Sequence, residues 1–197
     1  MSTKASKHKD QRVGVFVDAS NMYHSSKSLY QTNVNFGKIL EQAVAGRRLV
    51  RAMCYVISGS GQDEQSFFDA LEKQGFEVKS KELQVFSSGA KKGDWDVGIA
   101  IDAIKLADRL DTIVLVSGDG DFTTLVEYLK MTKGCRAEVM AFGESASMKL
   151  KEAADEFIDL SEDKKTFLMP LRPFRHRIIG NMPKVLGGRD AGEKQSG

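Results

Sequence analysis

The segment Thr112–Phe122, TIVLVSGDGDF, constrains the fold of this chain more than any other. It begins with a run of β-branched and aliphatic residues, which is typical of a strand buried on both faces of a parallel sheet. The strand stops at a small polar turn that carries Asp119 and Asp121. Ligands of parallel α/β folds bind at the carboxyl ends of strands, and Gly118 and Gly120 keep the backbone of this turn accessible. The turn is therefore the first candidate for a functional site.

Two other segments bring acidic side chains to the same kind of position. Asp18 follows the strand predicted over Val13–Val17, and Asp96 begins a predicted helix. A single aspartate after a strand is usually a helix cap, but the pattern recurs in three segments. Asn21, in the first turn of the helix after Asp18, is expected to project toward the same side. Carboxylates that meet at one sheet edge repel one another without a cation, so we predict a divalent-metal site formed by these three segments.

The rest of the chain alternates strands and helices, so we predict an α/β fold. With 197 residues and 41% hydrophobic content, the chain suits one domain over residues 12–160. In the helix predicted over 63–74, Phe67, Phe68 and Leu71 should point inward. The next segment, 76–86, alternates polar and apolar residues, which indicates an edge strand with Lys79 and Lys81 on its outer face.

Charge is distributed unevenly along the sequence. Residues 1–11 form a flexible basic N-terminus, and residues 161–197 form a basic, extended tail that contains the sequence PLRPFRHR, whereas the segment between them has an excess of acids. This distribution suits a polyanionic substrate, and the apolar residues of the tail equally suit a protein partner. No signal peptide or membrane span is recognisable, so we expect a cytoplasmic protein. Cys54 and Cys135 lack metal-site spacing and are expected to be buried, reduced thiols.

The loop before Asp96 mixes cations and acids. Lys92 precedes a glycine, so its ammonium group can lie near Asp96 and bind a phosphate. Trp95 is expected to seal the helix, with stacking on a nucleobase as the alternative. Asp102 lies about 120° around the helix from Asp96 and is a weaker candidate. Ser145 follows a later strand and is predicted to donate to a phosphate.

These motifs in this order resemble the NYN domain, in particular the LabA-like (DUF88) branch of the PIN-like nuclease superfamily. They are Asp18-x-x-Asn21, Lys92-Gly93 before Asp96, and SGDGDF, and the resemblance spans about Arg12 to Leu160. It implies a Rossmann-like three-layer fold with a central, mainly parallel sheet, and ribonuclease chemistry that depends on Mg²⁺ or Mn²⁺. The metal ligands that it implies are Asp18, Asp96 and Asp119, with Asp121 in support and Asn21 as an orienting group. Because the chain reads KGDWD where many members have a shorter KGxD spacing, Asp94 competes with Asp96, and we choose Asp96 since the helical pattern starts there.

The expected function is hydrolysis of RNA phosphodiester bonds, most simply in single-stranded RNA. Ser117 and Asn21 would hold water or a substrate oxygen. A haloacid-dehalogenase-like phosphatase is disfavoured because Ser20 stands where that family has a second acid, and no Gly-Lys-Ser/Thr phosphate-binding loop is present. The alternative to cleavage is an RNA-binding or regulatory NYN module that does not cut.

Overall fold

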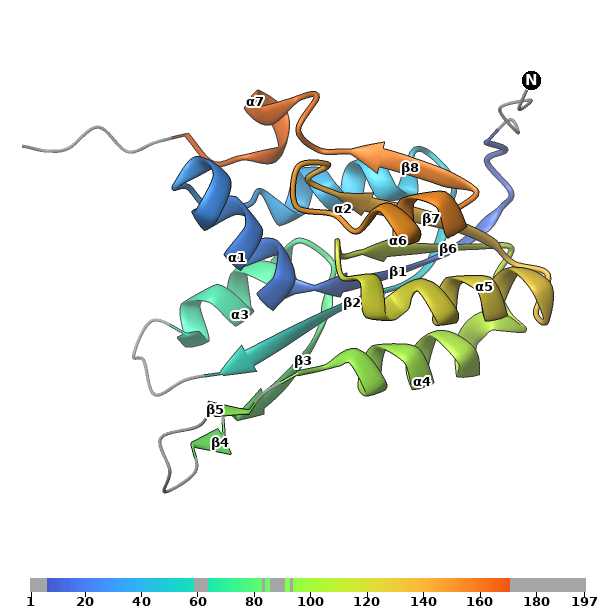
Figure 1. The fold of residues 1–197 in the computed structure, drawn as a ribbon, viewed down its shortest axis with the longest axis horizontal. Helices are drawn as coiled ribbons and strands as arrows, with labels where there is room; N and C mark the ends of the chain where they lie inside the picture. The colour runs from blue at the N-terminus through green and yellow to red at the C-terminus, as the bar shows by residue number, and fades with distance from the viewer. Residues whose placement is uncertain (1–6, 59–63, 83, 86–90, 93, 171–197) are drawn as a thin grey trace, which may run out of the picture.

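The computed structural model describes residues 7–58, 64–82, 84–85, 91–92 and 94–170. Their helices and strands alternate along the chain (Figure 1). In order they are β1 (Arg12–Asp18), α1 (Ala19–Tyr30), α2 (Phe36–Val44), β2 (Arg48–Ser58), α3 (Glu64–Lys73), β3 (Glu77–Glu82), β4 (Gln84–Val85), β5 (Lys91–Lys92), α4 (Asp96–Ala107), β6 (Thr112–Val116), the 3₁₀ turn η1 (Gly120–Phe122), α5 (Thr123–Met131), β7 (Arg136–Ala141), α6 (Met148–Ala153), β8 (Glu156–Asp159) and α7 (Lys164–Phe167).

Six strands form one sheet in the order β3-β2-β1-β6-β7-β8, and each neighbouring pair is parallel. This confirms the predicted α/β fold with a central parallel sheet between helical layers (Figure 1). From β1 the chain proceeds outward through β2 and β3, and from β6 it proceeds outward in the opposite direction. The order therefore reverses between β1 and β6, and in open α/β sheets the ligand crevice lies at the carboxyl ends of such a pair. Asp18 and the turn after Val116 end these two strands.

Side chains of the sheet alternate between two apolar cores. Val13, Val15 and Val17 of β1 join the core beneath α1, α2 and α3, whereas Phe16 joins the core beneath α4, α5 and α6. This alternation is the period of two expected for a strand covered on both faces. The buried run on β6, which sequence alone suggested, is confirmed because all five of its residues are buried.

The edge next to β2 differs in detail from the prediction. The expected single strand over 76–86 ends at Glu82, and β4 pairs with β5 as a separate antiparallel ribbon. Within α3, Leu71 is buried as expected, but Phe67 is 37% exposed, so the predicted inward position of Phe67 is wrong. Its ring instead packs against Phe36 of α2 at the surface, with ring centroids 6.0 Å apart.

Residues 161–169 pack onto the domain, whereas the sequence predicts an extended tail from position 161. Asp163 accepts a hydrogen bond from the amide of Thr166 and begins α7, and the Phe167 side chain is buried in the core beneath α1 and α2. Leu168 forms a β-bridge with Val34, and the amide of Met169 donates to the carbonyl of Asn33. The predicted patch PLRPFRHR lies almost wholly outside the described residues. No helix in the described part of the chain is long and apolar enough to span a membrane.

Candidate functional site

The turn after β6 is held in one conformation by its own hydrogen bonds. The Asp119 carboxylate accepts the amide N–H of Asp121 at 3.0 Å, and the amide of Asp119 donates to the Ser117 hydroxyl at 3.2 Å. Ser117 has no exposed surface. The predicted contact of Ser117 with substrate is therefore not available in this conformation, and the hydroxyl orients the turn instead.

Asp18 and Asn21 connect the turn after β1 to the turn after β6. Asp18 caps α1, because its carboxylate accepts the amide N–H of Asn21 at 3.0 Å. The side-chain oxygen of Asn21 in turn accepts the amide N–H of Gly118 at 2.9 Å. Asn21 thus projects toward the predicted side, and it fixes the two acid-bearing turns relative to each other.

Asp96 reaches the same edge from the first turn of α4. The preceding residue, Trp95, donates its indole N–H to the carbonyl oxygen of Val56 at 2.9 Å, and its ring meets the ring of Tyr55 edge-on at 5.4 Å between centroids. Gly98 makes room for the indole, since a Cβ atom at this position would lie 2.6 Å from the ring. Trp95 therefore seals the start of α4 against β2, as predicted, and so positions Asp96.

Three carboxylates meet at this edge. One oxygen from each of Asp96, Asp119 and Asp121 lies within 4.8 Å of the others, and we call these three residues the acidic group. Two of them are partly buried, and Asp121 is exposed. The sequence predicts Asp18 as the third ligand with Asp121 in support, whereas the geometry gives the third place to Asp121. Asp18 stays close enough for its charge to act on Asp96.

The electrostatics of the edge favour a bound cation. Burial raises the pKa of Asp96 from 3.8 to about 6, and the charges of Asp119 and the other nearby aspartates add to this effect. Burial also raises the pKa of Asp18, while the amide of Asn21 opposes the rise and the charge of Asp119 adds to it. Carboxylates whose pKa is raised by burial and by one another gain most from a counter-charge.

The structure also decides between the competing acids near α4. Asp94 is exposed and lies outside the acidic group, so the geometry favours Asp96 over Asp94. Asp102 points elsewhere, because its carboxylate accepts hydrogen bonds from Tyr55 at 2.8 Å and from Lys79 at 2.5 Å. Burial alone would raise the pKa of Asp102, but these two hydrogen bonds lower it below its ordinary value.

Two predicted phosphate-binding residues have different outcomes. Ser145 is exposed, and its hydroxyl donates to the carbonyl oxygen of Phe142 at 3.3 Å, so it is engaged within its own loop. Lys92 lies on β5, but its side chain is outside the described part of the structure, and its role stays a prediction.

Ser147 is a residue that sequence reasoning missed. Its hydroxyl oxygen lies 2.8 Å from the point where a Cβ atom of Gly120 would be, and its amide donates to the carbonyl of Gly118 at 2.9 Å. It therefore borders the turn between Asp119 and Asp121. Ser147 precedes α6, but its side chain makes no capping hydrogen bond. The sequence signal that could have identified Ser147 is its position directly before a helix, in the loop that follows β7, the strand next to β6.

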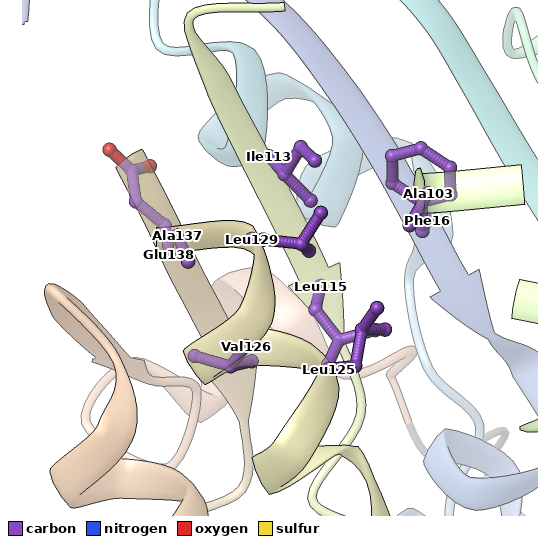
Figure 2. A pocket seen from close by; sticks show the side chains of 9 residues that line it. All are labelled: Phe16, Ala103, Ile113, Leu115, Leu125, Val126, Leu129, Ala137 and Glu138. Atoms are coloured by element: carbon purple, nitrogen blue, oxygen red, sulfur yellow. The ribbon is translucent and has the colours of Figure 1, made fainter. Parts of the chain in front are cut away.

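One pocket in the described part of the structure lies away from the acidic edge. It lies between the sheet and helices α4 and α5, lined mostly by apolar side chains such as Leu115, Leu125 and Leu129 (Figure 2). It has no room for a water molecule. Glu138 borders it, but the carboxylate of Glu138 binds Arg47. We interpret this pocket as a packing gap and assign the functional site to the acidic group.

Comparison with known proteins identifies the family of this chain. The model of the NYN domain matches residues 12–161. The chain is 32% identical over 163 residues to the low amplitude and bright protein LabA of Synechococcus elongatus, an alignment that covers 77% of this chain and 84% of LabA. The chain belongs to the LabA-like branch of the NYN-domain family. A crystal structure of VPA0982, a Vibrio parahaemolyticus protein of unknown function, has the same fold, with a TM-score of 0.75, 31% identity, and coverage of 83% of this chain and 99% of that chain.

NYN domains belong to the PIN-like nuclease superfamily. In this NYN domain, the matched residues 12–161 include β1 and β6 and with them the whole acidic group. The family match ends at residue 161, next to the predicted domain end at residue 160, and the described structure continues through α7. The segment of α7 is therefore an extension of the NYN domain that packs against it.

The raised pKa of Asp96 leads to a prediction about the metal-free protein. Its folded pKa of about 6 exceeds its ordinary value of 3.8, so the folded state loses stability as the pH rises from about 4 to 6. Asp96→Asn removes this loss. Relative to the unaltered protein, the variant should gain about 1–2 kcal/mol at pH 7 after allowance for solvent screening, and nothing near pH 4. Thermal melts in chelator across this pH range measure the difference.

Magnesium should reverse the order of stability of Asp96→Asn and the unaltered protein. A cation that binds only the folded state raises its stability, and Asp96→Asn should lose most of that rise. Asp94→Asn is the matched control, because this exposed acid lies two residues away and outside the acidic group. If Asp96→Asn melts lower at every pH and keeps the full response to Mg²⁺, then Asp96 only stabilises the start of α4.

Proposed function

We propose that this protein is a metal-dependent ribonuclease that hydrolyses phosphodiester bonds of RNA at the acidic group. The observation that carries the proposal is the meeting of Asp96, Asp119 and Asp121, from two separate segments, at the point where the strand order reverses. Membership of the NYN family, within the PIN-like nucleases, supports RNA as the substrate class. We propose single-stranded RNA as the form of the substrate, because an unpaired strand is accessible to side chains at the edge of the sheet.

The donor set of the acidic group fits Mg²⁺ or Mn²⁺. Both ions prefer oxygen ligands, and Mg²⁺ is usually held by one or two carboxylates together with water. Three carboxylate oxygens within 4.8 Å of one another suit such a hard cation, whereas the nearest thiol, Cys54, is fully buried. When bound, the cation would stabilise negative charge on the phosphate and make a water molecule more acidic. Asp18 is proposed as an additional, buried negative charge.

The protein's own residues have separate tasks in this proposal. Asp96, Asp119 and Asp121 hold the cation. Asn21 and Ser117 hold the backbone of the Asp119 turn through the hydrogen bonds described above, so the carboxylates need little reorganisation. In the absence of metal the pKa of Asp96 is raised to about 6, so a bound cation would favour the charged carboxylate that holds it. Lys92 is proposed to neutralise a neighbouring phosphate.

The direct test is an RNA cleavage assay. Purified protein is incubated with end-labelled single-stranded RNA and Mn²⁺ or Mg²⁺, with and without chelator. We expect cleavage only with free metal, and no release of phosphate from small monoesters. Release from monoesters without RNA cleavage would indicate a phosphatase instead. A mock preparation from cells that lack the protein controls for contaminating nucleases.

A second candidate function is RNA binding without cleavage. The observation that favours it is the position of Asp18, which is 7% exposed, caps α1 and stands outside the acidic group. With Asp18 engaged in this way, fewer carboxylates face the substrate. RNA that is bound in the presence of metal but remains intact would identify this function.

A protein partner for the C-terminal tail and a cytoplasmic location stay predictions.

Ser147 provides a further test of the site. Its hydroxyl borders the turn between Asp119 and Asp121 and is proposed to donate to a phosphate oxygen or to a water there. Ser147→Ala should reduce the cleavage rate about fivefold, since one neutral hydrogen bond is worth about 1 kcal/mol. Ser145→Ala is the matched control from the same loop and should leave the rate unchanged. Equal rates for both variants would assign Ser147 to packing alone.

A further inference from the structure

Lys81, on the edge strand β3, differs from its neighbour Lys79 in the partners of its ammonium group. Its ammonium group lies 3.3 Å from the carbonyl oxygen of Asp94 and 5.7 Å from the centroid of the Trp95 ring. Both are neutral partners, and within the described segments Lys81 forms no ion pair with a carboxylate. Lys79, two residues earlier on the same face of β3, is instead bound to Asp102 at 2.5 Å. The charge of Lys79 is therefore compensated, whereas no carboxylate of the described residues pairs with Lys81.

The aromatic partner of Lys81 is rigid. Trp95 is fixed by its hydrogen bond to Val56, by the edge-on ring of Tyr55, and by close packing on Gly98. A cation over a fixed indole is attracted by the negative face of the ring, so Lys81 is biased toward this position. Trp95 directly precedes Asp96 in the sequence, so the ammonium group of Lys81 is held at the start of α4, the helix that carries one member of the acidic group.

The chemistry of this cation points to a phosphate. The acidic group repels a polyanionic strand wherever the metal does not neutralise it, and a strand that crosses the edge needs cations beside the site. An ammonium group is a compact charge that binds phosphate oxygens as a point charge. We propose that Lys81, held over Trp95, binds a backbone phosphate of single-stranded RNA adjacent to the phosphodiester at the acidic group. This inference rests on the proposed function and names part of its substrate-binding surface.

The test uses binding and so does not depend on cleavage. The full-length protein with Asp119→Asn serves as the parent, and a short, fluorescently labelled single-stranded RNA is titrated at several salt concentrations with Mg²⁺ held constant. Each phosphate contact contributes about −0.7 to the slope of log K against log salt. Lys81→Gln should make the slope less negative by about 0.7 and weaken binding about fourfold at 0.15 M salt. Lys81→Arg, which keeps the charge and the ring contact, should restore the parent's slope.

Lys105→Gln is the matched control. Lys105 is exposed in the last turn of α4, about 13 Å along the helix from Asp96, and it forms no ion pair within the described residues. It should leave the slope unchanged. Parallel slopes for Lys81→Gln and the parent, with RNA bound by both, would overturn the role of Lys81 and leave the proposed function intact. Absence of RNA binding by the parent at every salt concentration would overturn both.

Discussion

Asp119→Asn should remove metal-dependent cleavage of RNA while the protein stays folded. The change is nearly isosteric, and the amide oxygen of asparagine can still accept the hydrogen bond from Asp121 that shapes the turn. It removes the charge of one of the three carboxylates that are proposed to hold the cation. Loss of one group that stabilises charge in a transition state typically costs 100- to 1000-fold in rate, and we expect a loss of this size. End-labelled RNA with excess Mn²⁺ gives the rate, and circular dichroism gives the fold.

Asp108→Asn controls for the loss of a negative charge as such. Asp108 is exposed at the far end of α4 and is paired with Lys133, so its variant should cut at the rate of the unaltered protein. Should Asp119→Asn cut RNA as fast as the unaltered protein, with the mock preparation inactive, the site is wrongly assigned. Equal loss of activity in both variants would indicate a general effect of charge on RNA binding.

The position of the candidate site could be predicted from the sequence because the end of a strand and the start of a helix are local features. A buried apolar run predicts where β6 ends, and the parallel order of strands brings the ends of β1 and β6 to one edge. The start of α4 at Asp96 follows from the helical pattern alone. These features depend on hydrophobic periodicity, which a single sequence records well.

The exact membership of the site depends on side-chain direction, which sequence patterns do not record. Asp18 caps its own helix, and the three carboxylates that lie together are those of Asp96, Asp119 and Asp121 instead of the predicted set with Asp18. Ser147 lies beside the acidic turn only because its loop folds over Gly118 and Gly120. Whether an aspartate such as Asp18 caps its own helix or joins carboxylates from distant segments is decided by tertiary packing.

Residues 161–169 differ from the extended conformation that the sequence predicts for a related reason. A helix as short as α7 shows no period, and one buried side chain, Phe167, provides most of its apolar anchoring. The segment is also held by backbone hydrogen bonds and by the β-bridge between Leu168 and Val34. Backbone contacts of this kind are not predicted by residue type. Sequence periodicity cannot reveal an element whose order comes from such contacts.

Glu138→Leu should destabilise the protein by about 3–5 kcal/mol, because it leaves Arg47 charged and unpaired in the core. Both side chains are fully buried, and the Arg47 guanidinium donates to the two oxygens of Glu138 at 2.8 Å each. Arg136 also donates to Glu138, at 3.0 Å. For a domain of this size the loss corresponds to a fall in Tm of about 10 °C. Thermal or urea unfolding measures it.

Two variants separate a buried charge from a lost contact. Arg47→Met combined with Glu138→Leu removes both charges of the pair and should recover much of the loss, since apolar side chains of similar volume often replace a buried ion pair at little cost. Asp111→Asn is the surface control. Asp111 pairs with Arg12 in an exposed bidentate contact, and its loss should cost about 1 kcal/mol or less. If Glu138→Leu costs no more than Asp111→Asn, the buried charge on Arg47 is relieved by solvent. The pair between Arg47, in the segment that joins α2 to β2, and Glu138 of β7 then does not stabilise the fold as the burial of its two side chains implies.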